Sequence, residues 1–211
     1  MWTTEEVAER VAADIPDGWT VNLGIGMPIA VAGPLQGRRV MIHSENGIIG
    51  MGGTPPEGQE DPDLVSAGKG PTMLVPGAAI VDSAVSFSLV RGGRLDLSVM
   101  GAYQVSVNGD LANWRLPDKR IAGVGGAADL AAGARRVWIT MKLRAKSGEP
   151  RVVQSLTYPL TARGCVSRVY SDMAVFVRSD RGLEVAEVAP EVDLDELCEL
   201  TGTRPAARLA S

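Results

Sequence analysis

The sequence predicts an α/β fold, an open and mainly parallel β-sheet with flanking helices, in one domain over residues 1–211. Short apolar segments of strand type alternate with helical segments along the chain, which is typical of βαβ units. No internal repeat or long linker divides the 211 residues, and a chain of that length forms its own core without disulfides or metals. Apolar residues make up 45% of the chain and aromatic residues 4%, so aliphatic side chains must build that core.

The helices are predicted from capping residues and apolar spacing. Thr3 and Glu6 have the spacing of a capping box, and Val7, Val11 and Ile15 fall on one face of the helix that follows. Three more helices are expected, over residues 30–35, 82–90 and 193–200. Asp82 would cap the start of the second and Gly92-Gly93 would end it, and Gly202 would close the third.

The strands are predicted from short apolar runs bounded by turn residues. They cover residues 20–25, 39–43, 72–75, 95–100, 136–141, 152–156 and 174–178. Residues 47–69 are rich in glycine, proline and acidic residues and have too little periodicity for regular structure. A loop of that length inside a compact domain is usually functional or mobile.

Composition excludes several classes of protein. A net charge of −4 argues against nucleic-acid binding, which depends on Lys and Arg at phosphates. No apolar run approaches the roughly 18 residues that span a bilayer, and the acidic N-terminus is unlike a targeting peptide, so we expect a cytoplasmic protein without a membrane partner. With one histidine and only Cys165 and Cys198, no metal site is expected.

Glycine is over-represented, with 25 of 211 residues, about 12% against a usual level of roughly 7%. Glycine permits close approach of the backbone to a ligand, and three segments are candidates. Gly24-Ile-Gly26 follows a strand but lacks the third glycine of a dinucleotide fingerprint, and Gly123-Val-Gly-Gly126 opens a helix. Taken alone, the first segment is more often a plain tight turn and the second a structural loop.

The third segment, His43-Ser-Glu-Asn-Gly47, lies where a predicted strand ends. Ligand sites of open α/β sheets gather at the carboxyl ends of the strands, so Glu45 is a candidate nucleophile or general base. A solvated acid before an Asn-Gly turn is the alternative. His43 and Ser44 are neighbours on a strand and point to opposite faces, so we expect His43 to be packed or hydrogen-bonded rather than paired with Ser44.

The order of five motifs resembles the B (beta) subunit of family I CoA-transferases of the 3-oxoacid and 3-oxoadipate type, over residues 4–204. Those motifs are Asn22-Leu-Gly-Ile-Gly-Met-Pro28, Ser44-Glu-Asn-Gly-Ile-Ile-Gly-Met-Gly52, Gly109-Asp-Leu-Ala-Asn-Trp114, Gly125-Gly-Ala-Ala-Asp-Leu130 and Tyr158-Pro-Leu-Thr161. The Ser-Glu-Asn-Gly segment is the most specific of them. Cys165-Val-Ser-Arg-Val-Tyr170 leans toward the oxoadipate branch.

The resemblance implies a CoA-transferase B-subunit fold and a set of roles. Glu45 would be the nucleophile, forming a mixed anhydride and then a glutamyl-CoA thioester, with Gly126 and Gly125 as amide donors to the oxyanion. Asn22 and Lys69 would support Glu45. The substrate and CoA vicinity would also include Gly24, Gly26, Met27, Asn46 and Gly47.

The resemblance also implies the substrates and the partner. Coenzyme A would enter as a thioester co-substrate, with succinyl-CoA as the donor and 3-oxoadipate or acetoacetate as the acceptor, and with no bound cofactor, ATP or metal. An A (alpha) subunit, expected to carry most of the CoA groove, would complete an α2β2 assembly.

Two departures from the family pattern bear on the acid substrate rather than on the transfer chemistry. Lys142-Leu143 stands where many relatives carry an acid and a histidine, and Ala128 stands where they carry Met. A family member repurposed as an acyl-CoA decarboxylase or hydrolase, or a noncatalytic partner subunit, remains an alternative. The presence of Glu45 and of the glycine loop disfavours both.

Overall fold

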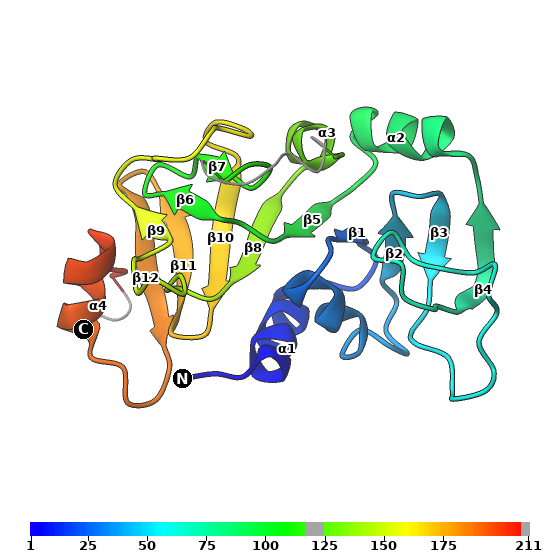
Figure 1. The fold of residues 1–211 in the computed structure, drawn as a ribbon, viewed down its shortest axis with the longest axis horizontal. Coiled ribbons are helices and arrows are strands. Elements are labelled where there is room, and N and C mark those ends of the chain that lie inside the picture. Colours follow the sequence, from blue (N-terminus) through cyan, green and yellow to red (C-terminus); the bar gives the residue numbers. More distant parts are fainter. Residues whose placement is uncertain (117–124, 208–211) are drawn as a thin grey trace.

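At the centre of the fold, five parallel strands lie side by side within a ten-stranded sheet (Figure 1). The computed structural model describes residues 1–116 and 125–207. In sheet order the parallel strands are β10 (Val166–Ser171), β8 (Val137–Met141), β5 (Leu97–Met100), β1 (Thr20–Leu23) and β2 (Met41–Ser44). The predicted α/β class with a parallel sheet is confirmed here, and β1 is placed beside both β2 and β5.

Antiparallel strands extend the sheet at both ends. Beyond β10 come β11 (Ala174–Ser179), β12 (Gly182–Val188) and the short β13 (Arg204–Pro205), which runs parallel to β12. Beyond β2 come β3 (Ile48–Met51) and the edge strand β4 (Leu74–Ile80). A separate small sheet has the order β7 (Leu111–Ala112), β6 (Gln104–Ser106), β9 (Val152–Val153).

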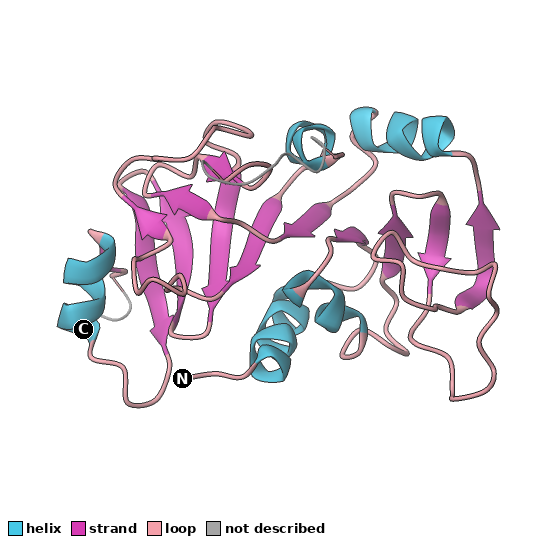
Figure 2. Cartoon of the chain, viewed as in Figure 1, coloured by secondary structure: helices cyan, strands magenta, loops and turns pink. Residues whose placement is uncertain are grey.

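Helices cover both faces of the parallel centre (Figure 2). On one face lie α1 (Thr4–Asp14) and the 3-10 helix η1 (Met27–Ala32), and on the other lie α2 (Ser83–Arg91) and α3 (Ala127–Gly133). The predicted capping box of α1 is present, because Glu6 N donates to Thr3 Oγ1 at 3.2 Å and Thr3 N donates to Glu6 Oε2 at 2.8 Å. The predicted C-terminal helix is α4 (Leu194–Thr201).

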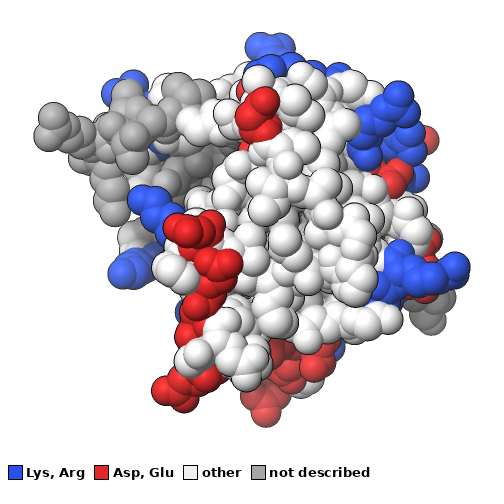
Figure 3. Space-filling view, turned by 90° about the vertical axis from the view of Figure 1, so that its right-hand side faces the viewer, with Lys and Arg blue, Asp and Glu red and all other residues white. Residues whose placement is uncertain are grey.

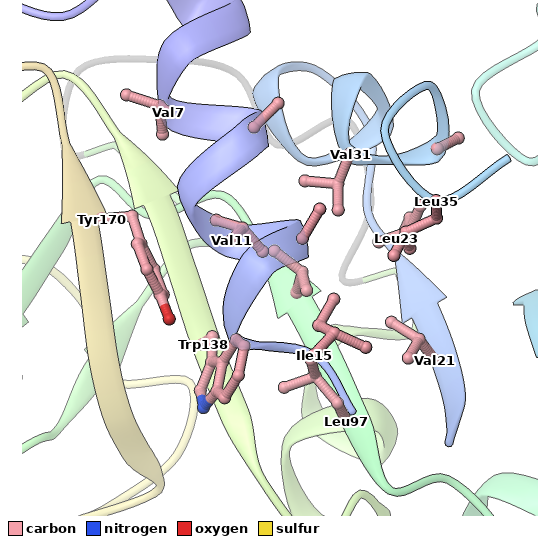
Figure 4. Packing of buried hydrophobic residues seen from close by; sticks show 14 of the residues in the cluster. Val7, Val11, Ile15, Val21, Leu23, Val31, Leu35, Leu97, Trp138 and Tyr170 are labelled. Carbon is pink, nitrogen blue, oxygen red and sulfur yellow. The ribbon is translucent and has the colours of Figure 1, made fainter. Parts of the chain in front are cut away.

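Alternate residues of the central strands supply two apolar clusters, one on each face. Figure 4 shows the cluster under α1, where Val11 of the helix and Ile15 just after it lie over Val21 of β1 and Trp138 of β8. The neighbours of Trp138 on β8, Val137 and Ile139, belong to the opposite cluster. The centre of the sheet is therefore buried on both sides.

Several local predictions were wrong in their limits. The segment 47–69 contains β3, whose pattern is disguised by Gly50, a residue with φ +87° where the β3–β4 register shifts. The helix expected over 30–35 is η1, which begins earlier because Pro28 occupies its first turn. Residues 152–156 contribute only the two residues of β9, while β4 extends well past the predicted 72–75.

Strands β10 and β12 were not predicted, since half-buried polar residues interrupt their apolar pattern. Within the part of the chain that the structure describes, no helix is long and apolar enough to cross a membrane.

Candidate active site

Glu45 lies immediately after β2, at the carboxyl end of the parallel sheet, where the chain turns back into β3. Gly47 closes this turn, with its N–H donating to Ser44 O at 3.0 Å and its O accepting from Val81 N at 2.9 Å. A Cβ at Gly47, where φ is +120°, would lie 2.0 Å from Val81 O. Only glycine fits that position, so the Asn-Gly step after Glu45 is a requirement of the fold.

The carboxylate of Glu45 is held by an amide from the neighbouring strand β1. Asn22 Nδ2 donates to Glu45 Oε2 at 2.9 Å and to His43 O at 3.2 Å, and the Asn22 side chain is fully buried. Ser98 Oγ approaches Asn22 Oδ1 at 3.4 Å. These contacts fix the amide with its N–H groups toward Glu45, leaving the other carboxylate oxygen, Oε1, for chemistry.

His43 is buried behind this pair and is hydrogen-bonded, as the sequence predicted. Its Nδ1 lies 3.3 Å from Asn22 Nδ2 and its Nε2 lies 2.9 Å from Ser86 Oγ on α2. Since the Asn22 amide nitrogen only donates, Nδ1 is the acceptor and Nε2 carries the proton. Burial lowers the pKa of His43, and the nearby charge of Glu45 partly opposes that shift.

One cavity of about 510 Å³ joins Glu45 to segments far apart in the sequence. Its volume is in the usual range for sites that bind small molecules. The predicted site residues that line it are Gly24, Glu45, Gly125 and Gly126. The remaining lining residues are Ile25, Met100, Gly101, Ala102, Tyr103, Asn113, Ala127, Leu130 and Arg151.

Two of the lining glycines lie where a side chain would collide with the framework of the site. A Cβ on Gly126 would lie 2.6 Å from the Phe87 ring, and one on Gly24 would lie 3.1 Å from Val99 O. Gly125 has φ +63°, a left-handed conformation that favours glycine. The glycine-rich turn therefore brings its backbone to the wall of the cavity, while Gly123 lies outside the described residues.

The other predicted site residues lie around the cavity rather than on its wall. Gly26, with φ +87°, precedes η1, and Met27 begins it. The Asn46 side chain donates to Val65 O at 2.8 Å and so links the turn after β2 to the loop that contains Val65.

Lys69 is exposed in that same loop, and its N–H donates to Ser66 O at 2.8 Å. Among the described residues, no ion pair joins Lys69 to Glu45. The loop itself reaches the end of β2, since Ala67 N donates to Ser44 Oγ at 3.0 Å.

Sequence reasoning missed several lining residues. Met100 and the three residues that follow it lie where β5 ends, so the strand-end rule that selected Glu45 could have found them. Asn113 belongs to a motif already singled out, whereas Arg151 carries no local signal.

The arrangement suits nucleophilic carboxylate chemistry. A half-buried carboxylate with one oxygen occupied by an amide faces a cavity lined largely by apolar side chains and glycine backbone. Among the described residues, no group of three or more His, Cys, Asp or Glu side chains is placed to hold a metal ion. Fold and site together define an α/β protein with a half-buried carboxylate facing a cavity at the carboxyl end of its sheet.

Comparison with known proteins gives the family. The family model described as coenzyme A transferase matches residues 4–200, and the chain belongs to that family. It is 52% identical over 198 residues to the B subunit of 3-oxoadipate CoA-transferase from Pseudomonas putida, covering 93% of each chain. It is 44% identical over 197 residues to the B subunit of succinyl-CoA:3-ketoacid coenzyme A transferase from Helicobacter pylori, covering 93% of this chain and 95% of that one.

The fold is also that of solved CoA-transferases. An acyl-CoA transferase from Escherichia coli O157:H7 superposes with a TM-score of 0.72 at 21% identity. The match covers 98% of this chain and 41% of the E. coli chain. The present chain therefore spans less than half the length of that transferase.

Proposed function

We propose that this chain is the B subunit of a 3-oxoacid CoA-transferase and that Glu45 carries the acyl and CoA groups in turn. The observation that supports this most strongly is the position of Glu45, hydrogen-bonded to Asn22 and open to the 510 Å³ cavity. The similarity to the B subunits of 3-oxoadipate and succinyl-CoA:3-ketoacid transferases supports succinyl-CoA as the donor and a 3-oxo acid, 3-oxoadipate or acetoacetate, as the acceptor.

The first half of the reaction charges the enzyme. The Glu45 carboxylate attacks the thioester carbonyl of the donor, and the C–S bond breaks to give a mixed anhydride and the CoA thiolate. The thiolate then attacks the glutamyl carbonyl, releasing the donor acid and leaving a glutamyl-CoA thioester. The acceptor carboxylate reverses both steps and leaves as its CoA thioester, restoring Glu45. Because one thioester is exchanged for another, the sequence of steps requires neither ATP nor a bound cofactor.

The proposed stabilisers of the oxyanions in these steps are backbone amides of residues that line the cavity. Gly126, with Gly125 beside it, is the proposed donor, and removing such a donor costs about 3–4 kcal/mol of transition-state stabilisation. Gly24 at the cavity wall would let the backbone approach the thioester closely, and Gly26 permits the turn that follows it. Asn22 positions the nucleophile, and the loop through Asn46, Gly47 and Lys69, with Met27 nearby, shapes the approach of CoA.

An A subunit is the proposed partner, in an α2β2 assembly. Figure 3 shows that the face beyond β4 is largely free of charged side chains. Leu74, Val75 and Ile80 of that edge strand are exposed, and so is Val85 of α2. An apolar edge strand left open to solvent promotes uncontrolled pairing, and a partner subunit over this face would prevent it.

Substitution of Glu45 tests the proposed function. The chain is co-purified with its A-subunit partner, and CoA transfer from succinyl-CoA to 3-oxo acids is followed by product chromatography. Glu45→Ala and Glu45→Gln should abolish transfer while the thermal unfolding temperature stays near that of the wild type, because Glu45 lies in a half-buried turn rather than in the core. Persistent transfer by either variant would contradict the assignment. Release of free CoA or of a decarboxylated product as the main wild-type outcome would favour a hydrolase or a decarboxylase instead.

A further inference from the structure

Arg151 lines the same cavity as Glu45 and has no role in the steps above. It directly precedes β9, and its backbone is fixed on both sides. Arg151 N donates to Leu143 O at 2.8 Å, and Arg151 O accepts from Val105 N at 2.8 Å. Because its backbone is hydrogen-bonded on both sides, Arg151 holds its side chain at a more defined position than a residue in a flexible loop would.

The charge pattern of the cavity singles out Arg151. Among the described lining residues, Glu45 is the only one with an acidic side chain and Arg151 is the only one with a cationic side chain. Seven of the other described arginines form ion pairs with carboxylates, and the rest, like Arg151, do not; the paired ones are Arg10, Arg38, Arg39, Arg91, Arg135, Arg168 and Arg181. Arg151 is half-buried, and its side chain has neither an ion pair nor a hydrogen bond to any residue that the structure describes.

A half-buried cation that no described residue pairs with is suited to bind an anion, because pairing offsets the cost of its partial desolvation. Arginine suits a carboxylate, since its planar guanidinium donates two parallel N–H···O bonds. The carboxyl group that reacts at Glu45 cannot be that anion, because it becomes an anhydride and then a thioester. The anion must belong to a part of the substrate that stays charged throughout.

We propose that Arg151 binds the distal, non-reacting carboxylate of a dicarboxylic substrate and thereby selects dicarboxylic acids and their CoA monothioesters. This inference rests on the proposed transfer reaction and names its substrate class. The distal carboxylate would be repelled by Glu45 and drawn to the cationic wall, so the two charged residues orient the substrate with its reacting end at Glu45. The other polar lining side chains, Tyr103 and Asn113, are uncharged and do not replace that pairing.

The test compares matched acids in the assembled enzyme. 3-Oxoadipate and 3-oxohexanoate have the same number of carbons and differ in the distal carboxylate. Arg151→Gln should lower kcat/KM for 3-oxoadipate by about 10- to 100-fold, mainly through KM, as expected for loss of a charged hydrogen-bonded pair. The value for 3-oxohexanoate should stay within about threefold, and Arg151→Lys should restore part of the loss.

Arg144→Gln is the matched control. It removes the same charge from an exposed position in the preceding hairpin, where Arg144 Nη1 donates to Gly148 O at 2.9 Å. It should leave both acids unaffected. Equal losses for the two acids in Arg151→Gln would overturn the proposal, because they would indicate a structural role.

Equilibrium titration separates this inference from the proposed function. Adipate should bind the wild type more tightly than hexanoate does, and Arg151→Gln should remove that difference whether or not Glu45 is the nucleophile. A wild type that does not prefer adipate would overturn the proposal. A loss of affinity for free CoA in Arg151→Gln would also overturn it, since the guanidinium would then serve the CoA phosphates. Failure of the proposed function is detected separately, by transfer activity in Glu45→Ala.

Discussion

Replacing Asn22 with alanine removes the amide that holds the Glu45 carboxylate in place. In the structure Asn22 Nδ2 donates to Glu45 Oε2 at 2.9 Å, from a side chain that is fully buried between strands. A hydrogen bond to a charged group is worth about 1.5–3 kcal/mol. If that interaction is retained in the transition state and lost in the variant, kcat/KM for the acyl-CoA donor should fall by about 10- to 150-fold.

The same substitution also affects folding by a predictable amount. Loss of the Asn22 amide leaves His43 O without its buried side-chain donor, so the free energy of unfolding should fall by about 1–3 kcal/mol. Urea unfolding gives this quantity, and kinetics are then measured well below the unfolding transition. In that range both proteins are folded, and the catalytic loss is separated from the loss of stability.

Two further substitutions sharpen the assay. Asn22→Asp keeps the shape but replaces a donor with a second carboxylate against Glu45, and it should lower the rate more than alanine does. Ser98→Ala removes only the long 3.4 Å contact to Asn22 Oδ1 and should cost less than about threefold. A folded Asn22→Ala enzyme with kcat/KM within about twofold of the wild type would refute this role for Asn22.

Three other predictions concern the framework of the site. Gly47→Ala should destabilise the fold by about 2–4 kcal/mol, because its Cβ would lie 2.0 Å from a backbone oxygen. Gly58→Ala, at φ +80° with no atom nearby, should destabilise the fold less, and thermal unfolding of the two variants measures the difference. Since burial lowers the pKa of His43 in the fold, the free energy of unfolding should fall as pH decreases through the unfolded-state pKa near 6.5. Urea unfolding between about pH 7.5 and pH 5.5 should show a smaller fall of that free energy for His43→Gln than for the wild type, and an equal fall would contradict this. Burial raises the pKa of the Cys165 thiol to about 11, so iodoacetamide should alkylate it more slowly at about pH 8 than an exposed peptide cysteine, and equal rates would contradict its burial.

Local chemistry explains which parts of the fold could be predicted. Thr3 with Glu6, and Asp82, hydrogen-bond to backbone groups within a few residues, and Gly202 adopts the left-handed conformation that ends α4. These signals are local in the sequence, and all three helix ends are confirmed. β3 was missed because Gly50 interrupts the pattern that identifies a strand. At the antiparallel ends of the sheet, β11 and β12 form a local hairpin, whereas the pairing of β3 with β4 joins segments separated by a long loop, which no local pattern encodes.

The residues of the candidate site likewise fall into those that the sequence predicted and those that it did not. Glu45 was found because its strand ends there, and the glycines at 24, 125 and 126 because their backbones require special conformations or close packing. Arg151 reaches the same cavity only through the pairing of β9 with β6, a contact between residues far apart in the chain. Its part in the site therefore follows from topology, and sequence reasoning overlooked it.

The central claim, that Glu45 becomes covalently linked to CoA, has a direct test. The enzyme assembled with its A-subunit partner is incubated with succinyl-CoA without an acceptor, treated with borohydride, digested and analysed by mass spectrometry. We predict that the peptide containing Glu45 carries a primary alcohol in place of the carboxylate, only when the donor is present, and that Glu45→Gln shows no such product. An unmodified Glu45 peptide from active enzyme, or reduction at another carboxylate, would contradict the claim.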